Sequence, residues 1–291
     1  METNELLKKV RKIEIKTKGL TNQVFTGSYH SAFKGRGMSF SEVRGYTYGD
    51  DVRAIDWNVT ARFDAPFVKV FEEERELTVM LLIDISKSSY FGTQKQFKNE
   101  FMAEIAAVLA FSAIQNNDKV GVMFFSNKVE KYIPPKKGKK HVLLIIRELL
   151  NIEPKEDSTD IGTALEYFNN LVKRRSIAFV MSDFKSKSYT NSLRIVRKKH
   201  DVIGLHVYDP MERDLPNIGL VQMEDLESGK KIWVDSSSDS LRRDYSQYFE
   251  DRRAENEKTF YRLKADFLSL NTADDYIAVM MQMFKRRGQR R

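Results

Sequence analysis

The sequence predicts an α/β protein built on a doubly wound, mainly parallel sheet. Two segments, ELTVMLLIDI (76–85) and SIAFVMSDF (176–184), are almost entirely apolar towards their ends, as is typical of central strands covered on both faces. Single helical patterns separate the predicted strands, which places helices on both faces of one sheet. A chain of 291 residues with 41% hydrophobic residues is long enough to bury such a core.

From residue 76 to residue 209 the pattern alternates between strand and helix. Phe97, Phe101 and Ile105 recur at helical spacing, and Asn127-Lys128 forms a two-residue turn between two strands. The predicted strands are 76–85, 118–126, 129–135, 176–184 and 201–209, and the predicted helices are 94–116, 139–150, 161–173 and 190–200.

The pattern changes after Pro216. A hairpin over 218–235 is followed by a helix over 240–263, a strand over 265–272 that completes the same sheet, and a final helix over 273–287. The first 75 residues read as a short charged helix followed by Gly- and Arg-rich sequence of low periodicity. We therefore expect an irregular N-terminal arm (1–75) packed on a main domain with a C-terminal extension (76–291).

The composition excludes several classes of protein. With no cysteine, the chain has no disulfide, no thiolate zinc site and no cysteine nucleophile. No apolar run is long enough to span a membrane, and the amino terminus has no apolar segment typical of a secretory signal. We expect a cytoplasmic protein.

Oxygen-bearing side chains follow three of the predicted elements. In an open parallel sheet the ligand lies beyond the carboxyl ends of the strands, where several loops meet. Two carboxylates and three hydroxyls are then available, a hard donor set that suits Mg²⁺, Mn²⁺ or Ca²⁺ better than zinc. The predicted metal ligands are Asp84, Ser86, Ser88, Thr159 and Asp183.

Each of these residues also has a purely structural interpretation. An Asp at a strand end followed by Ser often caps the next helix, and Thr159 and Asp160 precede a predicted helix. Asp183 follows an apolar strand, which is common in α/β proteins. The order of the three pieces along the chain favours the metal site.

That order resembles the von Willebrand factor A domain and its metal-ion-dependent adhesion site over about residues 76–210. Asp84, Ser86 and Ser88 match its DxSxS motif, Thr159 its threonine and Asp183 its second aspartate. The resemblance implies that these side chains hold the metal directly or through water, and that an acidic residue of a protein partner completes the ligand shell.

The segment before the first central strand, residues 35–75, resembles the bacterial family called domain of unknown function 58. The similarity rests on the Gly35/Gly37 pair, Arg44-x-Tyr46, GDDxR at 49–53, IDW at 55–57, Ala61-Arg62 and ExER at 72–75. Two interpretations stay open, a clasp of ion pairs that holds an irregular segment and a partner-binding surface specific to the family. The candidate partner-binding residues are Arg44, Asp50, Asp51, Arg53, Asp56, Trp57 and Arg62.

We expect no enzymatic activity. His200 and His206 lie at the end of a basic helix and inside a core strand, and no nucleophile elbow, phosphate-binding glycine loop or zinc-protease motif is present. A Mg²⁺-dependent phosphatase using Asp84 as its nucleophile is the enzymatic alternative, but Ser86 stands where that chemistry needs a general acid.

The resemblance implies a metal-dependent protein-binding module, an adaptor or co-chaperone of a MoxR-type AAA+ ATPase. The alternative is a protein that binds nucleic acid or an anionic surface, because the net charge is +8 and basic residues cluster at 136–140, 197–199 and 285–291. No nucleic-acid-binding module accompanies these clusters, so solvated loops are the simpler interpretation.

Overall fold

The computed structural model describes residues 39–63, 65–72, 76–93, 96–152, 158–224 and 229–289, with residues 11, 13, 27–29, 32 and 33. The predictions for Gly35, Gly37, Glu74, Arg75, His30 and the last two arginines lie outside these residues. The chain forms two compact units, one spanning Phe33–Leu77 and the other combining Met1–Ala32 with Thr78–Arg291.

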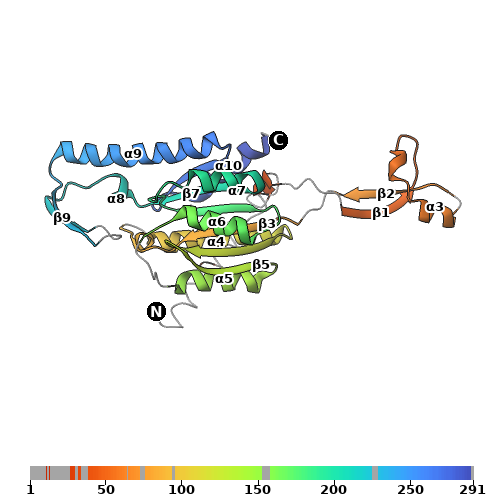
Figure 1. Cartoon of the computed structure of the whole chain (residues 1–291), viewed down its shortest axis with the longest axis horizontal. Helices are drawn as coiled ribbons and strands as arrows, with labels where there is room; N and C mark the ends of the chain where they lie inside the picture. The colour runs from red at the N-terminus through yellow and green to blue at the C-terminus, as the bar shows by residue number, and fades with distance from the viewer. Residues whose placement is uncertain are drawn as a thin grey trace. The chain divides into compact units, whose positions relative to one another are not determined.

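The larger unit contains a six-stranded sheet of order β10-β7-β6-β3-β4-β5 (Figure 1). Its strands pair in parallel except at the β4–β5 edge, which is antiparallel. This arrangement confirms the predicted mainly parallel sheet, including the late strand that joins it. The strands are β3 (Thr78–Asp84), β4 (Lys119–Phe125), β5 (Val129–Lys136), β6 (Ile177–Ser182), β7 (Asp201–Tyr208) and β10 (Asp266–Asn271).

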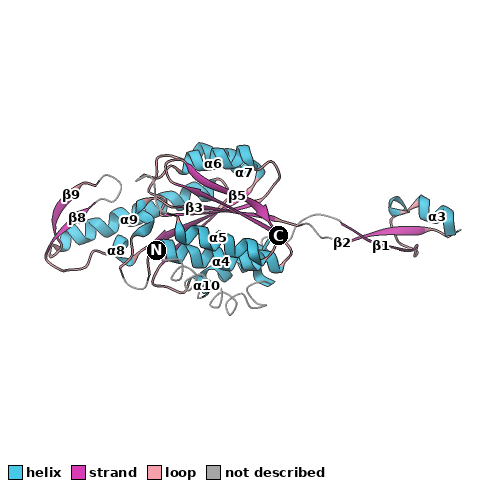
Figure 2. Ribbon diagram, turned by 90° about the horizontal axis from the view of Figure 1, so that it is seen from below, coloured by secondary structure: helices cyan, strands magenta, loops and turns pink. Residues whose placement is uncertain are grey.

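Helices cover both faces of this sheet (Figure 2): α6 and α7 lie on one face, and α4, α5 and α10 on the other. Strands β6 and β7 are buried along their whole length, because side chains on both faces meet a helix layer. The helices are α4 (Lys98–Gln115), α5 (Lys139–Asn151), α6 (Ile161–Leu171), α7 (Thr190–Lys199) and α10 (Tyr276–Gln289).

A hairpin of β8 (Leu220–Glu224) and β9 (Lys231–Asp235) leads into the long helix α9 (Asp239–Arg262), as the sequence predicts. Helix α9 approaches the sheet through Phe260, which lies over Gly204 of β7. A Cβ at position 204 would stand 2.7 Å from Phe260 Cζ, so glycine is required for this close approach.

Two short elements of the larger unit were absent from the sequence prediction. They are η2 (Lys87–Tyr90), which follows β3, and α8 (Pro210–Arg213), which follows β7. Each has only four residues, too few to show a helical period in the sequence.

The smaller unit has more regular structure than the irregular arm that the sequence predicts. It contains β1 (Ser39–Gly45), η1 (Val52–Ala54), α3 (Trp57–Phe63) and β2 (Phe67–Glu72), and the two strands pair in antiparallel fashion. A register shift between Phe40 and Glu42 interrupts the two-residue alternation of β1. That interruption hides the strand from a search for periodicity.

Candidate metal centre at the carboxyl edge of the sheet

Asp84, the last residue of β3, is the centre of the predicted site. Because β3 and β6 run parallel and in register, with Ile83 beside Met181, the next positions Asp84 and Ser182 are neighbours at the carboxyl edge. The Asp84 carboxylate accepts hydrogen bonds from the Ser182 hydroxyl at 2.6 Å, the Ser86 amide at 2.9 Å and the Thr159 hydroxyl at 3.2 Å. The residue is only 1% exposed, so its orientation depends on these donors.

The two serines of the DxSxS motif lie beside this carboxylate. The Ser86 and Ser88 hydroxyl oxygens are 3.1 Å apart, and both residues are buried. Asp84 caps no helix, since its backbone partner is the Ser86 amide and Ser86, the N-cap of η2, makes no side-chain cap hydrogen bond. The capping explanation therefore does not account for the motif.

Thr159 and Asp160 have different roles although they are adjacent. Asp160 is the N-cap of α6, and its carboxylate accepts a hydrogen bond from the Thr163 amide at 2.9 Å. Thr159 is 6% exposed and donates to Asp84, 75 positions away in the sequence. Asp160 is therefore the helix cap, and Thr159 is a candidate metal ligand.

Asp183 follows β6 and lies in a buried network of charges. One of its oxygens accepts from the Lys185 amide at 3.1 Å, and the other pairs with Lys98 Nζ at 3.2 Å. The Lys98 ammonium also contacts Glu212 at 3.0 Å, and Lys185 Nζ contacts the same Glu212 oxygen at 2.7 Å. Two lysines and two acids therefore neutralise one another beside the site.

The pKa values of the two aspartates are shifted in opposite directions. Burial, and then the nearby charge of Asp183, raises the pKa of Asp84 to about 6. Burial alone would raise the pKa of Asp183 as well, but Lys98 and Lys185 hold it below the ordinary aspartate value. Ser88 also donates a hydrogen bond that lowers the pKa of Asp183. Asp183 is consequently the more firmly ionised carboxylate.

Sequence reasoning missed three residues of this site. Ser182 was visible as part of the Ser-Asp pair that ends β6, but it was not named as a partner of Asp84. The signal for Lys98 was a cation in the first turn of a largely apolar helix, where the helix dipole disfavours positive charge. Nothing local marked Glu212, because its contacts with Lys98 join positions 114 residues apart.

The site opens into a cleft of about 690 Å³. Its lining includes Ser88 and Thr159 of the site and Tyr248 and Arg252 of α9. A separate small cavity of about 10 Å³ is lined by Asp84, Ser88, Lys98, Ser182 and Asp183, together with Ser89, Met102 and Val207. The remaining cleft residues are Phe91, Asn127, Ser158, Asp160, Lys185, Ser186, Lys187, Glu212 and Glu224.

The chemistry of the donors suits a hard divalent cation. Asp84 and Asp183 supply carboxylates, and Ser86, Ser88 and Thr159 supply hydroxyls, with no thiol or imidazole among them. Within the described parts of the chain, no group of three or more His, Cys, Asp and Glu residues is arranged to hold a metal. An ion at this edge therefore depends on the hydroxyl ligands.

The candidate partner-binding residues all lie in the smaller unit. Arg44 holds Asp50 with two hydrogen bonds of 2.8 Å, and Asp51 caps η1. Asp56 accepts from the Asn58 amide at the start of α3 and pairs with Lys69. This set thus contains a clasp at Arg44–Asp50.

The other members of that set face solvent. Trp57 is 69% exposed. Arg53 and Arg62 form no ion pair with another described residue. Among these three arginines, the ion pairing expected of a clasp is therefore seen at Arg44 alone, and Trp57 is accessible in this unit.

The three described histidines have framework contacts. His200 is bonded to Ser176 at 2.8 Å, His206 to Ser269 at 3.1 Å, and His141 to the Val120 carbonyl at 2.9 Å. Burial lowers the pKa of both His200 and His206 to about 4, so each is neutral near pH 7. None of the three lines the cleft.

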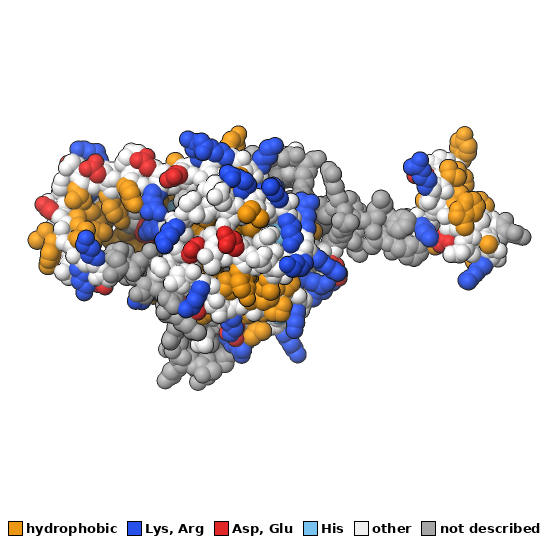
Figure 3. Space-filling view, viewed as in Figure 1, with side chains coloured by type: hydrophobic (Ala, Val, Ile, Leu, Met, Phe, Trp, Pro, Cys, Tyr) orange, Lys and Arg blue, Asp and Glu red, His pale blue; other side chains and the backbone are white. Residues whose placement is uncertain are grey.

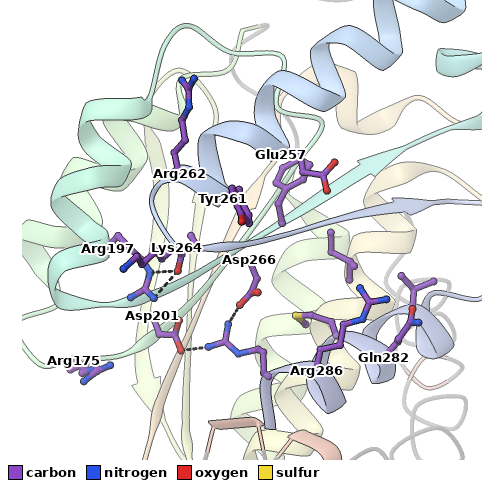
Figure 4. A pocket seen from close by; sticks show the side chains of 16 residues that line it. Arg175, Arg197, Asp201, Glu257, Tyr261, Arg262, Lys264, Asp266, Gln282 and Arg286 are labelled. Carbon is purple, nitrogen blue, oxygen red and sulfur yellow. Dashed lines mark hydrogen bonds and ion pairs between the residues drawn. The ribbon is translucent and has the colours of Figure 1, made fainter. Parts of the chain in front are cut away.

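A larger pocket, of about 860 Å³, lies at the amino-terminal ends of β7 and β10 (Figure 4). Arg287 is paired with both Asp201 and Asp266, and Arg197 donates to the Lys264 carbonyl at 2.9 Å. The other arginines of the pocket lie on separate sides of it in Figure 4 and do not converge on one point; they are Arg175, Arg262 and Arg286.

The basic clusters are partly engaged by the framework. Besides Arg197 and Arg287, Lys199 donates to the Val172 carbonyl at 2.8 Å. On the face shown in Figure 3, lysine and arginine side chains are interspersed with acidic and apolar ones rather than forming one continuous patch. These contacts favour a structural interpretation of the clusters. A search for membrane-crossing helices among the described residues found none of sufficient length and apolarity.

Several solved structures share part of this fold at low similarity. A conserved hypothetical protein, BatB from Bacteroides thetaiotaomicron, aligns with a TM-score of 0.47 and 17% identity over 73% of this chain and 99% of that chain. The SpRpn10 VWA domain aligns with a TM-score of 0.40 and 12% identity over 72% of this chain and 95% of that chain. Likenesses with TM-scores below 0.5 do not carry function from one protein to another.

Relatives in sequence cover nearly the whole chain. Uncharacterized proteins of Mycobacterium tuberculosis and Mycobacterium bovis are each 29% identical over 286 residues, which is 96% of this chain and 89% of the relative. A family model matches residues 42–255, spanning part of the smaller unit, the sheet edge with the candidate site and most of α9. The chain therefore belongs to the family described as protein of unknown function DUF58.

Proposed function

We propose that this chain is a non-enzymatic, divalent-metal-dependent protein-binding module that acts as an adaptor or co-chaperone of a MoxR-type AAA+ ATPase. Mg²⁺ is the ion proposed, with Mn²⁺ or Ca²⁺ as substitutes. The residues that would hold it are Asp84, Ser86, Ser88, Thr159 and Asp183. When bound, the ion supplies a positive centre able to accept a carboxylate from a protein partner.

One observation carries this proposal. Side chains from three separate segments lie around Asp84 at the carboxyl edge of the sheet. Two residues of this site, Ser88 and Thr159, also line a cleft of about 690 Å³. A cleft of that size accommodates one or two side chains of a partner protein. Its polar, mixed-charge lining suits an acidic residue better than an apolar ligand.

The same geometry gives little support to catalysis. Ser86 and Thr159 supply hydroxyls beside Asp84, and no described histidine reaches the cleft to act as a general acid or base.

A thermal-shift titration tests the metal. Mg²⁺ or Mn²⁺ should raise the Tm of the wild type, because a ligand that binds only the folded state stabilises it by about 2.7 kcal/mol at a hundred times its Kd. Asp84→Asn should abolish the shift. Asp244→Asn, which makes the same change at an exposed position of α9, should retain it. Equal shifts in Asp84→Asn and wild type would disprove the site as drawn.

A pull-down with the MoxR-type ATPase tests the partner. Capture should be lost in EDTA and in Thr159→Ala, with the folded state intact by circular dichroism. Thr163→Ala, on the exposed side of the next turn, is the matched control and should capture normally. Undiminished capture by Thr159→Ala would show that the ATPase binds elsewhere on the protein.

The alternative function, binding to nucleic acid or an anionic surface, makes the opposite prediction. Its binding would persist in EDTA and weaken steeply as salt rises, because released counter-ions drive it. The net charge of +8 is the observation in its favour.

A further inference from the structure

We propose that the Lys98 ammonium is a built-in counter-ion of Asp183 that competes with the divalent metal, so that metal binding requires Lys98 to withdraw from this carboxylate. This inference rests on the proposed function, since it concerns the same site. It adds a residue that the ligand motif does not contain.

Lys98 reaches the site from the first turn of α4. Its Nζ lies 3.2 Å from Asp183 Oδ2 and 3.0 Å from Glu212 Oε1, and its side chain is 2% exposed. A buried ammonium that starts a helix is unfavourable unless acids compensate it. Both acids here are within ion-pair distance, so the position of Lys98 is specified by the site.

The ammonium leaves little room for an ion. Lys98, Asp84, Ser88 and Asp183 line one cavity of about 10 Å³. That space is at the lower limit for a single water molecule, and a divalent ion with its own waters needs more. A metal that reaches Asp183 Oδ2 from this cavity must therefore displace the Lys98 ammonium, which contacts that oxygen at 3.2 Å.

Charge balance leads to the same conclusion. Lys98 and Lys185 match Asp183 and Glu212, two positive groups against two negative ones. A divalent ion placed beside this neutral group meets the buried Lys98 ammonium, where repulsion is strong, whereas Lys185, with a side chain that is 44% exposed, is better screened by solvent. The metal should therefore bind more weakly than its donor set alone would allow.

Lys98 can remain paired with Glu212 when it moves away from Asp183. Glu212 Oε1 contacts both ammonium groups, while Oε2 accepts from the Asp209 amide at 2.9 Å and is held in the capping box of α8. The Lys98 ammonium can thus keep one carboxylate partner as it gives up the other. Loss of Asp183 alone does not leave it unpaired.

Calorimetric titration with MnCl₂ tests this competition. Lys98→Gln by itself leaves two buried carboxylates against one lysine, which endangers folding. The informative comparison is between the wild type and the double variant Lys98→Gln/Glu212→Gln, because both sites have equal numbers of positive and negative groups. The double variant should bind Mn²⁺ at least about tenfold more tightly than the wild type, because it lacks the competing ammonium.

Two controls locate the effect. Lys258→Gln removes the same charge from an exposed position of α9 and should leave the Mn²⁺ affinity within about twofold of the wild type. Adding Asp84→Asn to the double variant should remove the gained affinity. A gain that survives Asp84→Asn would place the Mn²⁺ elsewhere and overturn the inference.

The remaining outcomes separate the two proposals. If the wild type binds Mn²⁺ and the double variant binds no more tightly than the wild type, the competition is disproved and the metal-dependent module stands. If no protein in the series binds Mn²⁺, both the competition and the metal site are disproved. Binding by the double variant alone would support Lys98 as the group that keeps the metal out.

Discussion

The Ser182 hydroxyl links two groups at the end of β6. It donates to Asp84 at 2.6 Å and accepts from the Phe184 amide at 3.0 Å. Ser182→Ala removes both contacts from a fully buried position, so the free energy of unfolding should fall by about 1–3 kcal/mol. Urea denaturation measures this change. Ser188→Ala, at an exposed position, should change stability by less than about 0.5 kcal/mol, and an equal loss in both variants would contradict the role assigned to Ser182.

Because His206 is buried, we expect the free energy of unfolding to fall in acid. Burial lowers its pKa in the folded chain from 6.5 to about 4, so between these values the unfolded chain binds a proton that the folded chain does not. The folded state should therefore lose up to roughly 3 kcal/mol as the pH falls from 7 to 4, from this residue alone.

Urea denaturation at several pH values measures this slope. His206→Phe keeps a ring among the surrounding aromatic side chains and removes the titration, so its stability should fall less steeply over the same range. An unchanged slope would assign the acid sensitivity to other groups.

At the scale of elements, Gly204 determines how closely α9 approaches the sheet. A Cβ there would lie 2.7 Å from Phe260 and 2.8 Å from Phe267. Gly204→Ala should push α9 away and lower the free energy of unfolding by about 1–3 kcal/mol, as overpacking does. Gly45→Ala, where a Cβ meets open space, should have a small effect. Because α9 lines the cleft, only Gly204→Ala should also weaken partner capture.

The elements of the sheet were predictable because buried parallel strands carry continuous apolar runs. The run before Asp84 and the one before Asp183 each placed an oxygen donor at a strand end, which sufficed to predict that the two meet. The partners Lys98 and Glu212 had no comparable signal, since each lies in a different helix and neither follows an apolar strand. Strand β1 was missed because a register shift breaks its alternation.

At the scale of the whole molecule, the two compact units predict separable functions. Trp57 lies in the smaller unit and is 69% exposed, so Trp57→Ala should change the Tm and the metal-induced shift very little. If the smaller unit is a partner-binding surface, the same variant should weaken capture of the ATPase. Tyr261→Ala, an equally simple loss of an exposed aromatic ring from the larger unit, is the control. Normal capture by Trp57→Ala would favour the clasp interpretation of the smaller unit.

The sharing of Glu212 between two lysines has a consequence for how the family changes over time. Lys98, Asp183, Lys185 and Glu212 come from three separate parts of the chain, yet loss of any one of them alone upsets the balance of two positive and two negative groups. We therefore expect the residues at these four positions to covary among members of the family. A descendant that replaced Lys98 by a neutral residue while also replacing Glu212 would keep its fold and acquire a more open metal site in a single step.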